Sequence, residues 1–190
     1  ELSGGETVAV LGSGTIGLCT IAAARAMGAG FIVATARYPQ QVNMARMLGA
    51  DLVVDSEGNE LSEALLDYSK GVGSDLTIET VGGRSDSVIT QAVDVTRKQG
   101  RIVTTGNFYT AIKFDWMKAI LKELSLIWSA TYATNNGRNE FQIAIEQMGR
   151  GLVNLKPLVT HRFPLSEIQK GLEISFDKNG GAIKVQIQTN

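Results

Sequence analysis

The sequence predicts an α/β fold whose core is a doubly wound parallel sheet. Between residues 7 and 130, short apolar runs alternate with segments whose apolar residues recur at helical spacing. The runs are apolar at nearly every position, which is typical of strands buried on both faces between two layers of helices. Strands that alternate with helices in this way form parallel sheets with right-handed crossovers. We therefore expect six parallel strands.

The elements of the first half follow one another at short intervals. Glycines at Gly28 and Gly49 end the first two helices, and Pro39 fits the first turn of the second, where its missing N–H costs nothing. In chain order, the expected elements are a strand at 7–11, a helix at 16–27, a strand at 31–35, a helix at 40–48 and a strand at 52–54.

The same alternation continues through the middle of the chain. In chain order, the expected elements are an amphipathic helix at 60–69, a strand at 76–79, a helix at 85–97, a strand at 101–104, a helix at 116–123 and a strand at 124–130. These three strands and the three before them make up the six strands of the expected sheet.

Residues 136–190 depart from this alternation. We expect helices at 137–149 and 166–176, with an extended segment at 158–163 between them. Residues 182–188 alternate apolar and polar side chains strictly, as a half-buried strand does. The six-stranded sheet is complete without this strand. We therefore divide the chain into a sheet domain at 1–135 and a segment at 136–190 that completes it and joins an absent second domain.

Charge and composition argue against several classes of protein. The formal net charge is −1, with acidic and basic residues interspersed, so neither a nucleic acid nor an anionic membrane surface is an expected partner. No apolar run approaches the roughly 18 residues that cross a bilayer, and no signal peptide opens the chain. The single cysteine, Cys19, excludes an internal disulfide. We expect a cytoplasmic protein, and the start at Glu1 indicates a fragment.

The run Gly12-Ser13-Gly14-Thr15-Ile16-Gly17 joins the first strand to the first helix. This G-x-G-x-x-G pattern has meaning only in such a strand–turn–helix context, where it is the fingerprint of the Rossmann fold. Gly12 permits a tight turn, Gly14 lets the backbone approach a pyrophosphate, and Gly17 lets the helix pack against the strand. The free N–H groups of Thr15, Ile16 and Gly17 then face the phosphates.

The end of the second strand decides between NAD and NADP. An acidic residue about 20 positions beyond the glycines would bind the ribose hydroxyls of NAD. Here the corresponding residues are Ala36, Arg37 and Tyr38, which include no acid. The guanidinium of Arg37 suits a 2′-phosphate, so the pattern favours NADP. NAD stays open, because Arg37 can equally be a solvated loop residue. Tyr38 either flanks the adenine or lies on the surface.

Together these segments resemble the cofactor-binding domain of medium-chain, zinc-type alcohol dehydrogenases. The resemblance covers nearly the whole chain and is far more specific than the glycines alone. It is carried by the segments at 5–17, 45–51, 75–82, 100–106 and 180–185. It adds to the cofactor site the residues Glu79, Thr80, Val81 and Gly82, on the adenosine side, and Thr105 and Gly106, near the nicotinamide half.

The resemblance implies hydride transfer between NADP(H) and a small alcohol or its carbonyl partner. It places the zinc ligands in an N-terminal, GroES-like catalytic domain that this chain lacks, so no catalytic or metal-binding residue is assigned here. The chain alone is expected to bind cofactor without turning over substrate. Zinc itself stays open, because quinone reductases share the cofactor domain and use no metal.

Relatives of this kind also suggest a homo-oligomer. In many of them the strand equivalent to Leu124–Ala130 is a sheet edge that pairs across a subunit interface, and this one has no proline to discourage pairing. Three alternatives remain. First, the full-length protein could be an NAD-dependent polyol or amino-acid dehydrogenase. Second, it could be a zinc-independent quinone or enoyl reductase. Third, the chain could be a non-catalytic module that responds to a dinucleotide.

Overall fold

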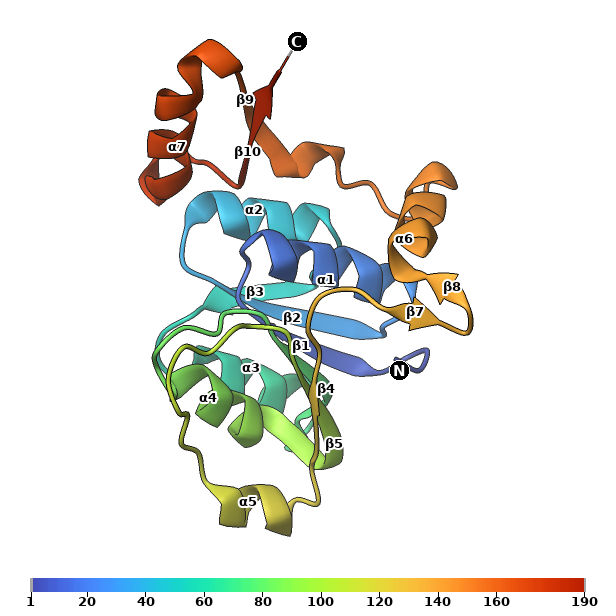
Figure 1. The fold of residues 1–190 in the computed structure, drawn as a ribbon. Coiled ribbons are helices and arrows are strands. Elements are labelled where there is room, and N and C mark those ends of the chain that lie inside the picture. The colour runs from blue at the N-terminus through green and yellow to red at the C-terminus, as the bar shows by residue number, and fades with distance from the viewer. Residues whose placement is uncertain (1, 190) are drawn as a thin grey trace.

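The computed structural model describes residues 2–189, except for the side chain of Asn135, and its core is the predicted six-stranded sheet (Figure 1). All of its strand pairs are parallel, and their order is β3-β2-β1-β4-β5-β6. The strands are β1 (Thr7–Leu11), β2 (Phe31–Ala36), β3 (Leu52–Asp55), β4 (Ser74–Glu79), β5 (Thr96–Thr104) and β6 (Ser125–Trp128). Chain order reverses at β1, between β2 and β4, which is where ligands bind in such sheets.

Two layers of helices sandwich this sheet, so the doubly wound α/β fold is confirmed. Helices α1 and α2 cover one face, and α3 and α4 cover the other (Figure 1). The helices of this domain are α1 (Thr15–Ala26), α2 (Pro39–Met47), α3 (Glu60–Tyr68), α4 (Ser87–Val95) and the short α5 (Trp116–Leu121). Pro39 occupies the first turn of α2, as predicted.

The two-sided burial explains why the strands read as apolar runs. In β1, Val8 and Val10 belong to the buried apolar cluster that includes Leu18 of α1. Ala9 and Leu11 belong to a second cluster on the opposite face, under α3 and α4. Because successive side chains of a strand point to opposite faces, both sets must be apolar when helices cover both faces.

Charged residues join three strands near their amino ends. Arg97 Nε donates to Asp75 Oδ1 at 2.6 Å, and the other oxygen of Asp75 accepts the Thr7 N–H at 2.8 Å. Arg101 Nη2 donates to Glu6 Oε2 at 2.6 Å. Burial raises the pKa of the Asp75 carboxyl, but these donors outweigh it and hold that pKa below its ordinary value of 3.8. The carboxylate therefore stays ionised and fixes β1 against β4 and β5.

Several helices are shorter than predicted, and the largest differences are in α4 and α6. Helix α4 ends at Val95 instead of residue 97, because β5 begins at Thr96, whose buried hydroxyl bonds to Thr77 of β4 at 2.7 Å. Helix α6 begins at Glu140 instead of residue 137. The preceding residues Arg138–Asn139 form β8, which pairs antiparallel with β7 (Thr134–Asn135). For α4, a strand partner from elsewhere in the chain overrides the local helical pattern. For α6, the turn Asn136-Gly137, with positive φ at both residues, closes a local hairpin before the helix begins.

The C-terminal segment forms a small separate sheet above α2 (Figure 1). Strands β9 (Val159–Pro164) and β10 (Lys184–Gln188) pair in parallel, and α7 (Ile168–Phe176) connects them. Burial alternates along β10, as the sequence predicted, with Val185 and Ile187 partly covered and their neighbours exposed. Short 3-10 turns lie at Lys156–Leu158, Leu165–Glu167 and Lys178–Gly180. Within residues 2–189, no helix is long and apolar enough to cross a membrane.

Candidate functional site

The glycine-rich turn lies between β1 and α1, at the carboxyl end of the sheet. Gly12 has a φ of +94°, a conformation that L side chains rarely adopt, and a Cβ there would lie 2.5 Å from Cγ2 of Val81. The Gly12 N–H donates to Thr35 Oγ1 at 2.8 Å, and the Ser13 hydroxyl donates to the Thr35 carbonyl at 2.8 Å. The end of β2 therefore fixes the shape of the turn.

The other two glycines of the pattern differ in what surrounds them. A Cβ on Gly17 would lie 1.9 Å from the Gly12 carbonyl oxygen, so only glycine allows α1 to approach the turn this closely. A Cβ on Gly14 would meet nothing within 4 Å. Close packing of α1 against the turn thus requires glycine at position 17. Gly14 instead lies beside open space that a ligand can enter.

The first turn of α1 presents backbone donors to that open space. Its first intrahelical bond runs from the Leu18 N–H to the Gly14 carbonyl at 2.9 Å. The preceding N–H groups of Thr15, Ile16 and Gly17 have no carbonyl one turn earlier to accept them. Gly14, at the N-cap position, also has no side chain to cap them. Three N–H groups at the positive end of the helix dipole suit a phosphate group.

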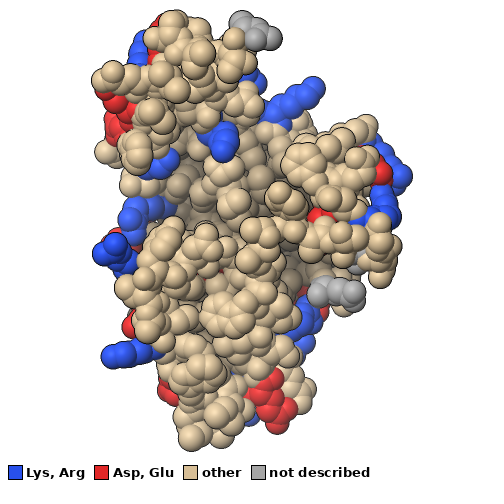
Figure 2. All heavy atoms as spheres, in the orientation of Figure 1, with Lys and Arg blue, Asp and Glu red and all other residues tan. Residues whose placement is uncertain are grey.

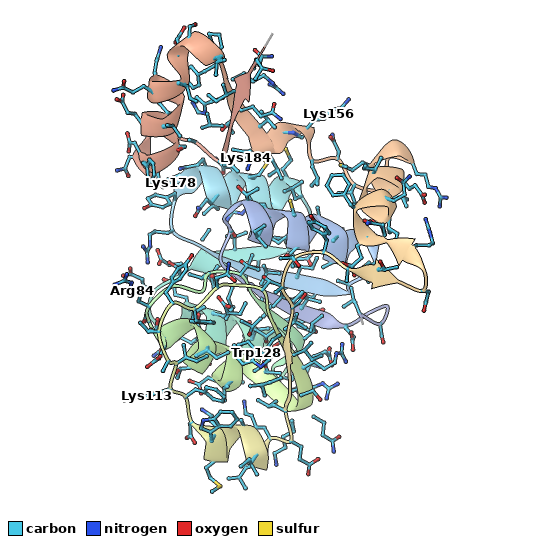
Figure 3. The ribbon with its side chains drawn as sticks, viewed as in Figure 1. Arg84, Lys113, Trp128, Lys156, Lys178 and Lys184 are labelled. Atoms are coloured by element: carbon cyan, nitrogen blue, oxygen red, sulfur yellow. The ribbon has the colours of Figure 1, made fainter. Side chains whose placement is uncertain are left out.

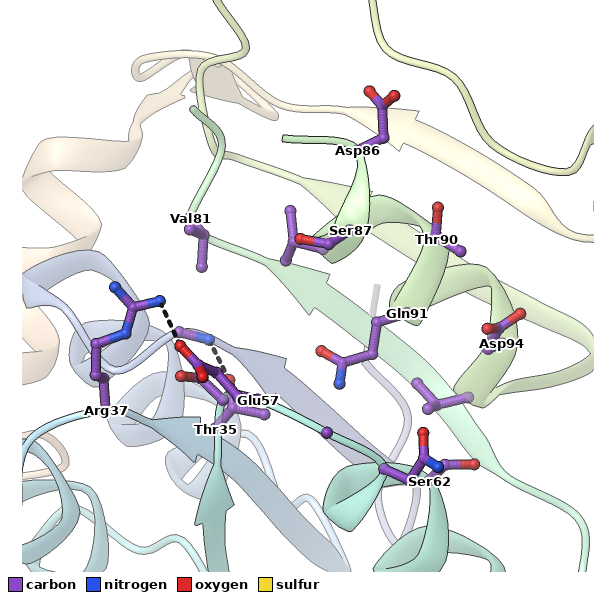
Figure 4. Close-up of a pocket in the computed structure, with 16 residues that line it drawn as sticks. Thr35, Arg37, Glu57, Ser62, Val81, Asp86, Ser87, Thr90, Gln91 and Asp94 are labelled. Carbon is purple, nitrogen blue, oxygen red and sulfur yellow. Dashed lines mark hydrogen bonds and ion pairs between the residues drawn. The ribbon is translucent and has the colours of Figure 1, made fainter. Parts of the chain in front are cut away.

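The end of β2 places Arg37 at the rim of the site. Ala36 is buried, and Tyr38 precedes the first turn of α2. The Arg37 N–H donates to Gln41 Oε1 at 3.2 Å, which fixes the backbone at this point. The guanidinium extends into the cleft, where its Nη2 lies 3.6 Å from Glu57 Oε1 (Figure 4).

The carboxyl end of β4 is tied to the glycine turn. The Thr80 N–H and its hydroxyl both donate to the Leu11 carbonyl, at 3.0 and 2.8 Å. The same hydroxyl is 3.2 Å from the Gly12 carbonyl oxygen. These bonds hold the chain after β4 against the turn after β1, at the point where chain order reverses.

Glu79 connects the loops that follow β4 and β5. Its side chain is fully buried, and Oε1 accepts the N–H groups of Val81 and Gly82 at 2.6 and 2.7 Å. Its carbonyl accepts the N–H groups of Thr105 and Gly106 at 2.9 and 3.2 Å. All six residues that the resemblance added to the site thus meet at one place, with Glu79 at the centre.

A cleft of about 780 Å³ runs from the ends of β1, β2 and β4 along the groove between α3 and α4 (Figure 4). Of the predicted site residues, Gly12, Arg37 and Val81 line it. Ala36 and Tyr38 line a smaller hollow of about 400 Å³ on the other side of Arg37. The remaining predicted residues, including those of the first turn of α1, line neither hollow.

The prediction missed Ser56 and Glu57, which line the same cleft from the loop after β3. It considered an acid only along the β2 segment, where NAD enzymes of this fold have one. A signal was nonetheless present, because consecutive strands are usually neighbours in such sheets and the carboxyl ends of neighbouring parallel strands meet at one edge.

Basic side chains border the hollow between the sheet domain and the C-terminal segment (Figure 2). Figure 3 places Lys178 and Lys184 on the upper side of this hollow and Arg84 on the lower side. The start of β10 also reaches α1, since the Thr15 hydroxyl donates to the Ile183 carbonyl at 3.4 Å. Positive charge near a helix N-terminus increases its attraction for an anionic ligand.

Comparisons with known proteins agree with this geometry. The family described as zinc-binding dehydrogenase matches residues 15–150. The chain belongs to that family. It is 32% identical over 172 residues to the erythritol/L-threitol dehydrogenase of Mycolicibacterium smegmatis, covering 89% of this chain and 45% of that protein. It is 33% identical over 190 residues to the L-idonate 5-dehydrogenase of Vitis vinifera, covering 96% of this chain and 50% of that protein.

A solved structure of a dehydrogenase has the same fold. The 2R,3R-butanediol dehydrogenase of Bacillus subtilis superposes with a TM-score of 0.85 at 26% identity, covering 100% of this chain and 52% of that one. The chain therefore spans about half the length of these relatives. The resemblance drawn from the sequence is confirmed.

Zinc, which the family name implies, finds no site among residues 2–189. No three His, Cys, Asp or Glu side chains of this part of the chain are grouped so that they could hold a metal ion. Cys19 is half-buried on α1, and burial raises the pKa of its thiol, which disfavours the thiolate that binds metals. Among residues 2–189 there is a cleft at the strand ends but no such metal-ligand cluster.

Proposed function

We propose that this chain is the NADP(H)-binding part of a zinc-dependent, medium-chain alcohol dehydrogenase. The observation that carries the cofactor choice is the side chain of Arg37, which extends into the cleft from a β2 end that bears no carboxylate. Its fork of N–H donors matches a phosphate, and nothing at Ala36 or Tyr38 repels one.

The pyrophosphate of the dinucleotide takes its place on the first turn of α1. The donors there are the N–H groups of Thr15, Ile16 and Gly17, and Gly14 provides the room for the phosphates to approach. The adenosine half then extends toward Arg37 and the loop after β4, and the nicotinamide half toward the loop after β5. Val81, Gly82, Thr105 and Gly106 form those loops, and Glu79 fixes their backbone.

In the proposed reaction, a hydride passes between the nicotinamide and a small alcohol or its carbonyl partner. Relatives named as dehydrogenases of erythritol, L-idonate and sorbitol support this reaction class. A catalytic zinc supplies Lewis acidity to the substrate oxygen in such an enzyme. The residues of this chain bind and orient the cofactor, and the zinc ligands belong to a second, GroES-like catalytic domain.

Two exposed surfaces support partners for the sheet domain at 1–135. The segment at 136–190 carries exposed apolar side chains on α7, including Leu172 and Phe176, which a catalytic domain would cover. Strand β6 is one of the two edge strands of the sheet, and its Ile127 and Trp128 are exposed. An uncovered edge of this kind suits pairing with a second copy, so we propose a homo-oligomer.

The second candidate function is that of an NAD-dependent polyol dehydrogenase, and the carboxylate of Glu57 favours it. Glu57 brings a carboxylate to the cleft from β3, close to the position where an acid at the end of β2 would bind the ribose hydroxyls of NAD. The two candidates differ in whether Arg37 contributes to binding.

Replacing Arg37 with alanine separates the two candidates. We expect the dissociation constant for NADPH to rise about ten-fold or more, because a charge-assisted contact to the 2′-phosphate is lost. The constant for NADH should change less than about two-fold, since NADH has no such phosphate. Titration followed by the fluorescence of the reduced nicotinamide measures both. Arg46→Ala is the matched control, because Arg46 is exposed on α2 and does not line the cleft. An unchanged NADPH affinity in Arg37→Ala would favour the NAD enzyme.

A further inference from the structure

We propose that Glu57 sets the relative affinity of this site for NADPH and NADH, by competing with the 2′-phosphate for Arg37. This inference rests on the proposed function, because it assumes that Arg37 receives the phosphate. It assigns to Glu57 a role in specificity that the pattern of residues at the end of β2 did not suggest.

Strand register brings Arg37 and Glu57 together. Ala36, the last residue of β2, pairs with Asp55, the last residue of β3. Arg37 is one position beyond the first strand end and Glu57 is two positions beyond the other. Because the strands are parallel, both residues leave the sheet at the same edge, beside the glycine turn.

Local hydrogen bonds hold both backbones in place. The Glu57 N–H donates to Asp55 Oδ1 at 2.8 Å, and the Asp55 N–H donates to Glu60 Oε2 at 3.0 Å. The Arg37 N–H donates to Gln41. The loop after β3 therefore presents Glu57 to the cleft in a defined conformation, and the two charged side chains face each other without reorganising the backbone (Figure 4).

The ion pair itself is loose enough to open. The nearest nitrogen and oxygen are 3.6 Å apart, beyond a hydrogen bond, and the side chains are 63% and 78% exposed. Exposed pairs of this kind contribute little to stability, because water solvates both partners well. Arg37 can thus leave Glu57 for a more highly charged partner at small cost.

Ser56 is a second sign that this corner of the cleft receives a polar ligand. Its hydroxyl oxygen is buried and has no hydrogen-bond partner among the described residues, although the residue lines the cleft beside Arg37 and Glu57. A buried hydroxyl without a partner is costly, and a ribose hydroxyl or a phosphate oxygen would satisfy it.

The two cofactors meet Glu57 differently. A 2′-phosphate carries roughly two negative charges at neutral pH, so it must draw Arg37 from Glu57 and then lie near that carboxylate. The free ribose hydroxyl of NADH can instead donate to Glu57, as it donates to the acid of NAD enzymes. Glu57 therefore weakens the binding of NADPH and favours that of NADH. The preference for NADPH over NADH is then smaller than it would be with Arg37 alone.

The test is Glu57→Gln, which removes the charge and keeps the size. We expect NADPH affinity to rise about two- to five-fold, the range that one exposed charge pair supports, and NADH affinity to stay equal or fall. The NADPH gain should shrink at high salt, where exposed charges are screened. Glu63→Gln is the matched control, because Glu63 is exposed on the adjacent helix α3 and does not line the cleft. It should leave the ratio of the two affinities unchanged.

The same titrations on Arg37→Ala, and on the variant that combines Arg37→Ala with Glu57→Gln, complete a double-mutant cycle. Competition for Arg37 requires that Glu57→Gln strengthen NADPH binding more when Arg37 is present than when it is alanine. Equal gains in both backgrounds, or equal effects of Glu57→Gln and Glu63→Gln, would overturn the inference. If Arg37→Ala weakens NADPH binding but Glu57→Gln changes nothing, the proposed function stands and only the inference fails. If Arg37→Ala changes nothing, the NADP choice itself fails.

Discussion

Replacing Gly17 with alanine is expected to destabilise the protein by about 3 kcal/mol, the upper part of the range for overpacking a closely packed site. The added Cβ would lie 1.9 Å from the Gly12 carbonyl oxygen and 2.8 Å from its carbonyl carbon. These are backbone atoms, so no side chain can rotate away to make room. Helix α1 must move off β1, which also disturbs the core around Leu18. Denaturant unfolding followed by circular dichroism measures the change in the free energy of unfolding.

Gly14→Ala is the matched control for that experiment. A Cβ at Gly14 meets nothing within 4 Å, and its φ of −72° suits any residue. The stability loss should stay below about 1 kcal/mol, as for an altered N-cap. NADPH binding should nonetheless be weakened, because the methyl group enters the space proposed for the pyrophosphate. Equal destabilisation by the two substitutions would contradict the separate roles given to these glycines.

Glu79→Ala is expected to destabilise the protein by about 2 to 4 kcal/mol, because it removes the acceptor for two loop N–H groups, of Val81 and Gly82. The buried side chain also leaves a cavity when it is truncated. The loop after β4 then loses its fixed shape next to the glycine turn, so we expect weaker binding of NADPH and NADH alike. Denaturant unfolding and cofactor titration on the same sample measure both effects.

Glu79→Gln separates the hydrogen bonds from the charge. Glutamine keeps a side-chain oxygen that can accept the same N–H groups, so it should retain more stability than alanine does. Glu79 Oε2 is buried and has no partner among the described residues, so the amide nitrogen that replaces it would also lack one. Stability within about 0.5 kcal/mol of the unmodified protein for Glu79→Ala would show that the loops hold their shape without this carboxylate.

Local pattern was sufficient to predict most of this fold. Strands β1 and β2 are buried on both faces, so their apolar runs are what that environment requires, and glycines and Pro39 mark the helix ends. One error arose where a distant partner decides the structure. Thr96 continues into β5 because Thr77 of β4 lies beside it. The second error is a local one: Arg138 belongs to a hairpin closed by Asn136-Gly137, a turn signal that the expected helix at 137–149 overlooked.

In the candidate site, too, local sequence order predicts some residues and the arrangement of the strands decides the others. Residues contiguous with the glycine turn and with the end of β2 could be placed from the sequence, because their roles follow from the order strand–turn–helix. Ser56 and Glu57 could not be placed in that way. They reach the cleft through the register of β2 with β3, which brings Asp55 level with Ala36 across the sheet. An ion pair between residues 37 and 57 follows from strand order and register together, and neither residue predicts it alone.

We propose that the chain binds a dinucleotide at the first turn of α1 and selects its 2′-phosphate through Arg37. The most direct test is to measure the dissociation constants of NADPH and NADH for the unmodified chain under identical salt and pH. We predict saturable binding of both, with NADPH bound about three- to ten-fold more tightly, as one charge-assisted contact opposed by Glu57 implies. Tighter binding of NADH, or no saturable binding of either cofactor to the folded chain, would contradict it.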